Sequence, residues 1–347
     1  DFARVVLDEA QYIKNPLTQV ARAAKRLPAG VRFALTGTPI ENRLSELWSI
    51  FDFLMPGLLG TRESFAKRFE SPVEHAEGDS AARLQALVSP FVLRRVKEDV
   101  VADLPEKIED TVMAQLTGEQ RKLYLANQDR IAQQVQHREA SEFKKDKLKV
   151  LAELTKLRQI CCDPRLHYED YKAGSAKLDT CMELVHGALD GGHRILLFSQ
   201  FTGMLDIIGK RLSKEDIAFL KLTGASSKES RAKMVAQFQA GEVPVFLISL
   251  KAGGVGLNLT AADVVIHYDP WWNVAAQDQA TDRAHRIGQQ HTVTVYKLIA
   301  KDTIEERIMQ MQESKRDLVN SVLGGDGISS ALFTREDVLA LLGGDGR

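Results

Sequence analysis

Residues 244–258 read Pro-Val-Phe-Leu-Ile-Ser-Leu-Lys-Ala-Gly-Gly-Val-Gly-Leu-Asn, a short apolar run that leads directly into a glycine-rich loop. An unbroken apolar run of this length is typical of a strand that is buried on both faces of a parallel sheet. Glycines directly after such a strand let backbone N–H groups approach phosphates, either of a nucleotide or of DNA. Many loops contain glycine, so this loop alone does not show that the chain binds a nucleotide or DNA. Evidence from the rest of the sequence is needed.

Similar apolar runs recur along the chain. We predict buried strands at residues 4–7, 31–35, 194–198, 218–222, 244–249, 263–267 and 292–299. Helical segments of about 10–15 residues separate most of the later strands, and this alternation predicts a parallel sheet with crossover helices. The fold class is therefore expected to be α/β.

Three stretches are predicted to be helical. Residues 45–54 and 335–342 have the pattern of single helices, and residues 119–160 form a long charged stretch with helical periodicity. Lys144, Lys145, Lys147 and Lys149 lie within the long stretch. Two interpretations of these lysines stay open, because they fit either a solvated helix face or a helical protrusion that faces DNA.

Composition limits the class of protein. The 347 residues are enough for two domains, and 46 basic against 47 acidic side chains leave a net charge of −1. Any DNA contact must therefore come from local patches. Three cysteines cannot form a disulfide framework, so a reducing, intracellular setting is expected. There is no apolar run of about 18 residues, and no membrane partner is expected.

Two polar loops follow the first two predicted strands. Asp8-Glu9-Ala10-Gln11 ends the first strand, where a nucleotide hydrolase needs one carboxylate for Mg²⁺ and a second for the attacking water. Thr36-Gly37-Thr38 ends the second strand, and its hydroxyls could bond to the acidic pair and sense a γ-phosphate. Each loop taken alone also fits an ordinary turn.

The stretch at 279–289, Gln-Ala-Thr-Asp-Arg-Ala-His-Arg-Ile-Gly-Gln, brings two arginines close together. Arg283 and Arg286 are three positions apart, so on a helix they would share one face. Two guanidiniums aimed together can neutralise the charge on a transferring phosphoryl group. The alternative for such a pair is a solvent-exposed surface.

Taken in order, these stretches resemble the motifs of the Swi/Snf family, which belongs to the helicase-like superfamily two. The stretches that carry the resemblance are 8–11, 35–42, 195–201, 249–258, 269–273 and 279–289, with further matches at 90–97, 104–107, 157–164 and 175–178. The resemblance extends from residue 1 to about residue 320.

The resemblance implies two RecA-like lobes that close over ATP and step along duplex DNA. It divides the chain into a remnant of the first lobe (1–98), a connector with a helical insertion (99–174), the second lobe (175–320) and a tail (321–347). It implies ATP and Mg²⁺ as cofactors, double-stranded DNA as a partner and a DNA-bound protein complex as a further partner. The activity that it implies is a DNA-dependent ATPase that translocates along DNA like a chromatin remodeller.

The resemblance also assigns roles to single residues. Asp8 would position Mg²⁺, Glu9 would act on the attacking water, and Arg283 and Arg286 would reach the phosphates. The residues that would contact nucleotide are Gln11, Gly254, Gly256 and Gln279, and those that would couple hydrolysis to lobe movement are Thr36, Gly37 and Thr38. The residues that would approach the DNA backbone are Ser199, Gln200, Thr223, Gly224, Lys251 and Trp272. His267, His285 and the cysteines are expected to be structural.

One family feature is missing from the sequence. The family places a G-x-x-x-x-G-K-[ST] phosphate loop upstream of the acidic pair, and no such string occurs in these 347 residues. We expect a longer protein to supply it, although a truncated gene fits equally. The chain alone is therefore expected not to hydrolyse ATP, and residues 1–60 should expose an apolar sheet face.

Two other functions stay open. The missing loop fits a nucleotide-independent DNA-binding or interaction module, whereas the acidic pair and the two arginines favour a motor. A helicase acting on RNA is a further alternative, which the stretches at 90–107 and 157–178 disfavour by their resemblance to the Swi/Snf family. Strand separation is not expected. The location would be the cytoplasm or nucleoid of a bacterium, or the nucleus of a eukaryote.

Overall fold

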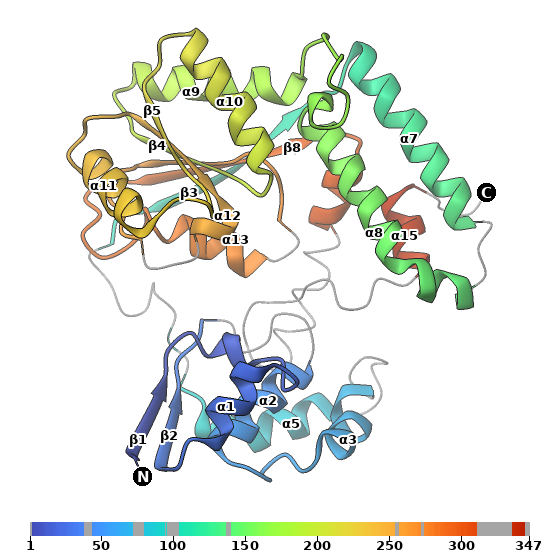
Figure 1. The fold of residues 1–347 in the computed structure, drawn as a ribbon, viewed down its shortest axis with the longest axis vertical. Helices are drawn as coiled ribbons and strands as arrows, with labels where there is room; N and C mark the ends of the chain where they lie inside the picture. The colour runs from blue at the N-terminus through green and yellow to red at the C-terminus, as the bar shows by residue number, and fades with distance from the viewer. Residues whose placement is uncertain are drawn as a thin grey trace. The chain divides into compact units, whose positions relative to one another are not determined.

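The computed structural model describes residues 2–37, 44–71, 80–93, 95, 104–136, 140–253, 257–271, 274–310 and 335–343. The described chain falls into two compact units, one built mainly from residues up to Arg95 and the other mainly from the residues after it (Figure 1). Each unit has a parallel sheet of its own.

The first unit is built on two parallel strands. Its elements are β1 (Phe2–Leu7), the 3₁₀ helix η1 (Ala10–Ile13), α1 (Gln19–Arg26), β2 (Ala29–Ala34), α2 (Leu44–Leu54), α3 (Arg62–Phe65), the π-helix η2 (Ala66–Glu70), α5 (Ser80–Val88) and the 3₁₀ helix η3 (Ser89–Phe91). β1 pairs with β2 so that Leu7 lies opposite Ala34. Thr18 and Thr61 cap α1 and α3 by accepting backbone N–H groups of the first turn.

The two faces of the β1–β2 sheet differ. Side chains on one face pack with Ile50 and Phe53 of α2. The other face leaves large apolar side chains about half exposed, namely Phe2, Val6, Val31 and Phe33. An exposed apolar sheet face in residues 1–60, as expected from the sequence, is therefore present in the described residues.

The second unit holds a six-stranded sheet in the order β3-β8-β7-β4-β6-β5, with every neighbouring pair parallel. Its strands are β3 (Lys107–Ala114), β4 (Ile195–Ser199), β5 (Phe219–Leu222), β6 (Val245–Ser249), β7 (Val264–His267) and β8 (Val293–Ala300). Its helices are α7 (Gly118–Gln136), α8 (Ala140–Cys162), η4 (Pro164–Leu166), α9 (Ala176–Asp190), α10 (Thr202–Lys214), α11 (Lys228–Gln239), α12 (Leu250–Gly253), α13 (Val274–Thr281) and α15 (Arg335–Leu341).

The central strands are covered on both faces. Ile195 and Leu197 of β4 pack in one apolar core, and Leu196 and Phe198 pack in a second core on the opposite face. Figure 1 shows α9 and α10 over one face and α11, α12 and α13 over the other. This two-sided burial is the reason that these strands are unbroken apolar runs in the sequence.

Most of the predicted elements are confirmed, and two differ. The seven predicted strands appear within about two residues of the expected limits, as do the helices predicted at 45–54 and 335–342. The helical stretch predicted at 119–160 forms two helices, α7 and α8. The sequence analysis did not predict β3, which lies in the predicted connector and pairs with β8 at the sheet edge. The limits at 98, 174 and 320 stay predictions.

No described helix combines the length and the apolar character that crossing a bilayer requires.

Candidate functional site

The acidic pair lies at the carboxyl end of β1. Glu9 has a left-handed backbone conformation with φ of 51°, which costs a non-glycine residue about 1–2 kcal/mol. Its N–H group donates a 2.9 Å hydrogen bond to Oδ1 of Asp8. The N–H group of Ala10 donates to the carbonyl of Leu35, so the loop after β1 is tied to the loop after β2. Backbone strain of this kind is typical of functional sites.

A chain of two hydrogen bonds joins the two predicted loops of the first unit. The hydroxyl of Thr36 donates to Oε1 of Gln11 at 2.8 Å, and Nε2 of Gln11 donates to Oε2 of Glu9 at 2.6 Å. From the sequence, a hydroxyl is expected near the acidic pair and Gln11 is expected only to bind nucleotide. The structure makes Gln11 the link between them. Gly37 follows directly, and Thr38 lies outside the described residues.

Asp8 has the chemistry of a Mg²⁺ ligand. Its side chain is exposed, and among the residues that the structure describes the Glu9 N–H group bonds to Oδ1 and leaves Oδ2 open to solvent. Mg²⁺ in nucleotide sites is held by one or two carboxylates, with phosphates and water supplying the other ligands. The described residues hold no group of three or more His, Cys, Asp or Glu side chains around a common centre. The donor set therefore fits a single-carboxylate Mg²⁺ site and no all-protein metal cage.

In the second unit, Asp269 links the loops after β4 and β7. Its carboxylate is 1% exposed and accepts hydrogen bonds from the Ser199 hydroxyl and, at 3.1 Å, from the Gln200 N–H group. The N–H group of Phe201 donates to the Ser199 oxygen at 3.1 Å. The Ser199 side chain is thus buried and engaged within the protein, while Gln200 is partly exposed. The DNA contact predicted for Ser199 would require this bonding to change.

Two other predicted DNA residues, Thr223 and Gly224, lie at the same edge of the sheet. Thr223 and Gly224 follow β5 in a turn that the Ser226 N–H group closes onto the Thr223 carbonyl at 3.1 Å. Gly224 is exposed and Thr223 is partly exposed. The Lys251 side chain, Gly254, Gly256 and Trp272 lie outside the described residues. The structure therefore brings Gln200, Thr223 and Gly224 to the carboxyl ends of β4 and β5, which flank β6.

The two arginines do not share a helix face, which corrects the expectation from their spacing. Helix α13 ends at Thr281, and residues 282–288 form turns and bends. Arg283 is 8% exposed, whereas Arg286 is exposed and its Nη1 donates to the Leu257 carbonyl at 3.5 Å.

The N–H groups of Asp282, Arg283 and Ala284 donate to the carbonyls of Asp278, Ala280 and Thr281, so the chain leaves α13 through a series of turns. Further along, Nε2 of Gln289 donates to the carbonyls of Ala262 and Ala284, at 2.8 and 3.1 Å, and ties these turns to the segment before β7. Gln279 stays on α13 and is partly exposed.

The histidines have structural contacts, as expected from the sequence. Nε2 of His267 lies 2.8 Å from the Thr281 hydroxyl, and Nε2 of His285 lies 2.7 Å from the Pro105 carbonyl. Burial lowers the pKa of His267 to about 3, so this ring is neutral at neutral pH. Burial also raises the pKa of the Cys181 thiol to about 12, which leaves it an unreactive apolar side chain.

A fully buried ion pair was not predicted. Lys177 and Glu305 are both 0% exposed, and Nζ lies 2.5 Å from Oε2. Burial opposes the charge on Lys177, but the Glu305 carboxylate outweighs burial and raises the pKa of Lys177. Glu305 also accepts the Ala300 N–H group at 2.9 Å, at the end of β8. Lys177 belongs to the stretch 175–178, for which the sequence analysis gave no role.

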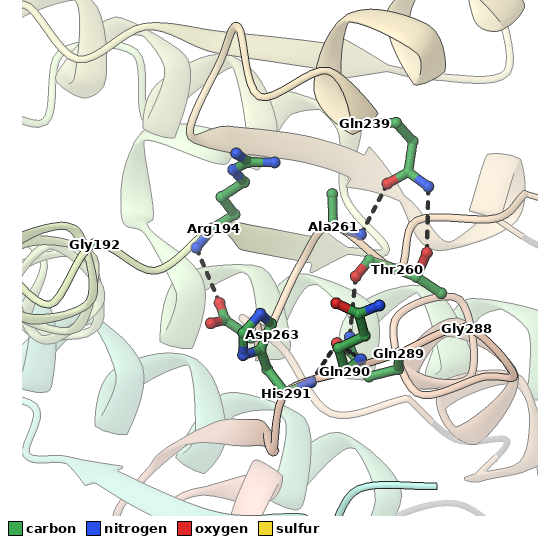
Figure 2. Close-up of a pocket in the computed structure, with 10 residues that line it drawn as sticks. All are labelled: Gly192, Arg194, Gln239, Thr260, Ala261, Asp263, Gly288, Gln289, Gln290 and His291. Carbon is green, nitrogen blue, oxygen red and sulfur yellow. Dashed lines mark hydrogen bonds between the residues drawn. The ribbon is translucent and has the colours of Figure 1, made fainter. Parts of the chain in front are cut away.

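A polar pocket of about 380 Å³ lies at the opposite edge of the second sheet (Figure 2). Arg194, Asp263 and His291, which precede β4, β7 and β8, line it together with Gln239 and Gln289. Figure 2 shows Gln239 bonded to Thr260 and Ala261. The described residues with predicted nucleotide or DNA roles do not line this pocket, so it supports neither role.

A parallel sheet covered by helices on both faces is a doubly wound α/β fold. An acidic pair at a strand end in the other unit fits the RecA-like ATPases among such folds. Comparison with known proteins narrows this class. The SNF2-related domain family matches residues 1–166, and the helicase conserved C-terminal domain family matches residues 176–288. The chain belongs to the SNF2 family of ATP-dependent helicase-like proteins.

Individual relatives agree with this assignment. The chain is 42% identical over 342 residues to a protein of Mycoplasma pneumoniae named uncharacterized ATP-dependent helicase, covering 98% of this chain and 32% of the relative. It is 36% identical over 346 residues to the DNA repair and recombination protein RAD26 of Saccharomyces cerevisiae, covering 92% of this chain and 31% of the relative. The chain thus spans about a third of the length of the curated relatives it matches.

Solved structures give the same result. The SWI2/SNF2 ATPase core domain of Sulfolobus solfataricus is 38% identical, with a TM-score of 0.58 over 97% of this chain and 70% of that chain. The same core in complex with double-stranded DNA is 40% identical, with a TM-score of 0.55 over 91% of this chain and 67% of that chain.

Proposed function

We propose that this chain is part of an ATP-driven translocase that moves along double-stranded DNA. The observation that carries the proposal is the chain of hydrogen bonds from Thr36 through Gln11 to Glu9. Through these bonds, the loop after β2 can orient the Glu9 carboxylate after β1. Coupling of ATP hydrolysis to movement of the lobes needs such a connection. Support for duplex DNA comes from the related Sulfolobus core, which was solved with it.

The chemistry of hydrolysis is assigned to the first unit. Asp8 would hold Mg²⁺, whose charge offsets that of the phosphates. Glu9 orients or deprotonates the attacking water, and Gln11 holds the Glu9 carboxylate in place. Arg286, whose side chain is exposed, is proposed to reach the phosphates. Arg283 is buried and is proposed to act beside it, with Gln279, Gly254 and Gly256 completing the contacts of the second unit.

DNA contact is assigned to the carboxyl edge of the second sheet. Gln200, Thr223, Gly224, Lys251 and Trp272 are proposed to meet the DNA backbone, which positions a motor without reading sequence. A protein complex on the DNA is the proposed further partner, because one relative is named TATA-binding protein-associated factor 172. The proposed location is wherever that DNA lies, the nucleoid of a bacterium or the nucleus of a eukaryote.

The chain alone is proposed not to hydrolyse ATP, since its sequence holds no phosphate loop. The test measures ATP hydrolysis with and without duplex DNA, on this chain and on a version extended upstream through a phosphate loop. We expect hydrolysis by the extended version only, accelerated by DNA. Glu9→Gln in that version should lower the maximal rate by about 100-fold or more while ATP still binds.

Two outcomes would replace the proposal. If the extended version is inactive while both versions bind duplex DNA, the chain is a nucleotide-independent DNA-binding module. If duplex RNA stimulates hydrolysis more than duplex DNA at equal concentration, the protein acts on RNA. Matched DNA and RNA duplexes of one sequence provide the control.

A further inference from the structure

Arg158 is a buried arginine that contacts two loops at once. It lies on α8 and is 1% exposed. Its Nη1 donates to Oε1 of Gln200 at 3.1 Å, and its Nη2 donates to the carbonyl of Pro270. Its guanidinium carbon lies 5.8 Å from the centre of the Phe201 ring. The two loops are those after β4 and β7, which are neighbouring strands.

Asp269 links the same two loops from within. Its carboxylate extends from the loop after β7 to the Ser199 hydroxyl and the Gln200 N–H group in the loop after β4. The two loops are therefore held together by two buried charged side chains. One is Asp269, which belongs to the loop after β7, and the other is Arg158 of α8. Each buried charge is costly by itself, and the Asp269 carboxylate favours the charged form of the Arg158 guanidinium.

Only an arginine can make this pair of contacts. The guanidinium presents several donors in a rigid plane, so it can hold an amide oxygen and a backbone carbonyl at a fixed spacing. A lysine has a single ammonium group, which cannot reach both acceptors in the same geometry. The residue type at position 158 therefore suits the bridge, whereas filling a core would need no charge.

We propose that Arg158 is a positioning residue, which sets the spacing between loop 199–201 and loop 269–271 so that both present one surface to DNA. The proposal rests on the proposed function, since the DNA-facing role of Gln200 and Trp272 is part of it. It also links helix α8 to the proposed DNA-facing edge of the sheet.

The first test follows amide hydrogen exchange in this chain. Arg158→Lys keeps the charge and most of the volume but loses the bridge. We expect the amides of Gln200 and Phe201, which donate to Asp269 and Ser199, to exchange about tenfold faster, the factor that one charge-assisted hydrogen bond is worth. The amides of Leu197 and Leu247 within β4 and β6 should be unchanged.

Two further variants separate the bridge from general stability. Arg130→Gln removes the ion pair between Arg130 of α7 and Glu153 of α8, the helix that also carries Arg158. Amide exchange in both loops should be unchanged in this variant. Gln200→Ala removes one acceptor at a partly exposed site. It also removes a 3.4 Å hydrogen bond from Nε2 of Gln200 to the Pro270 carbonyl. Faster exchange of the Trp271 amide, which lies in the other loop, would therefore show that Gln200 couples the two loops even if Arg158→Lys does not fold, and an unchanged Trp271 amide would contradict that coupling.

The second test measures DNA-stimulated ATP hydrolysis in the upstream-extended version. Arg158→Lys should raise the duplex concentration for half-maximal stimulation about tenfold, with a smaller change in the maximal rate. Unchanged protection of both loops would overturn the proposal, as would equal loosening of β4 and the loops. If amide exchange in both loops becomes faster but the duplex concentration for half-maximal stimulation is unchanged, the loops do not present a DNA-binding surface and that part of the proposal is overturned. If the unsubstituted version shows no DNA stimulation, the proposed function fails, and hydrogen exchange still decides whether Arg158 positions the loops.

Discussion

Thr36 follows β2 and Gln11 lies in the 3₁₀ helix η1 after the neighbouring strand β1, and the hydroxyl of Thr36 donates a 2.8 Å hydrogen bond to Oε1 of Gln11. This bond fixes the orientation of the Gln11 side-chain amide. Its oxygen accepts from Thr36, so its nitrogen faces the Glu9 carboxylate. The position of the loop after β2 is thereby transmitted to the carboxylate after β1.

Thr36→Val should reduce ATP hydrolysis about tenfold in the upstream-extended version, because it removes the hydroxyl and keeps the shape of the side chain. Thr36→Ser retains the hydroxyl and should keep most of the activity. The measurement is the steady-state rate with saturating duplex DNA. Equal rates for the valine and serine variants would show that the bond to Gln11 has no part in hydrolysis.

Lys177→Met should destabilise the second unit by about 3–5 kcal/mol, because it leaves the fully buried Glu305 carboxylate without its cation. The double variant Lys177→Met, Glu305→Leu should recover most of that loss, since an apolar pair of similar volume needs no charge compensation. Urea unfolding of this chain measures both values. If the double variant is as unstable as the sum of the single variants, the two side chains are not coupled.

The ion pairs of Glu109 with Lys107 and Lys297, at the β3–β8 edge of the second sheet, predict that the stability of the chain depends on pH. Burial by itself raises the pKa of Glu109, but Lys107 and Lys297 outweigh it and lower that pKa to about 2 from an ordinary value of 4.5. A lowered pKa in the folded state adds stability above pH 4.5, and this stability is lost as the pH falls from 4.5 toward 2. Thermal melts of Glu109→Gln should lack this part of the acid-induced decrease in Tm. A parallel decrease in both proteins would contradict the ion pairs of Glu109 with Lys107 and Lys297.

Gly241→Ala should destabilise the chain by about 1 kcal/mol, because Gly241 has φ of 79° and an added Cβ would also displace the Arg194 guanidinium. Gly187→Ala is the matched control. Gly187 lies within α9, where a Cβ meets no atom within 4 Å, so alanine should stabilise by about 0.5–1 kcal/mol. Urea unfolding that shows the same sign for both variants would contradict the left-handed backbone conformation of Gly241.

The central sheet was predictable because its strands are buried on both faces. β4 and β6 have no alternation of polar and apolar residues, so their sequence marks them directly. β3 lies at the edge and reads Lys-Ile-Glu-Asp-Thr-Val-Met-Ala, mostly exposed, so its sequence resembles a solvated connector. Strand pairing, a tertiary property, makes it a strand.

The sequence indicated which residue types form the candidate site. It indicated less about how their side chains contact one another. The acidic pair and Thr36 could be placed at strand ends, but the role of Gln11 depends on the register of Leu7 opposite Ala34, which no local pattern encodes. Arg158 and Lys177 were missed because a charge on a helix usually faces solvent. One signal was present for Arg158, since Leu154, Leu157 and Cys161 surround it at helical spacing and are all buried.

The pairing of β3 with β8 has a practical side for anyone expressing the second lobe by itself. A recombinant protein that starts at residue 175, where the sequence suggests the lobe begins, would omit β3 and leave β8 as an edge from Val293 to Ala300 with free backbone groups. Open edges of this kind invite intermolecular pairing and inclusion bodies. A start upstream of Leu104 keeps β3 in the expressed polypeptide and should give a more tractable preparation.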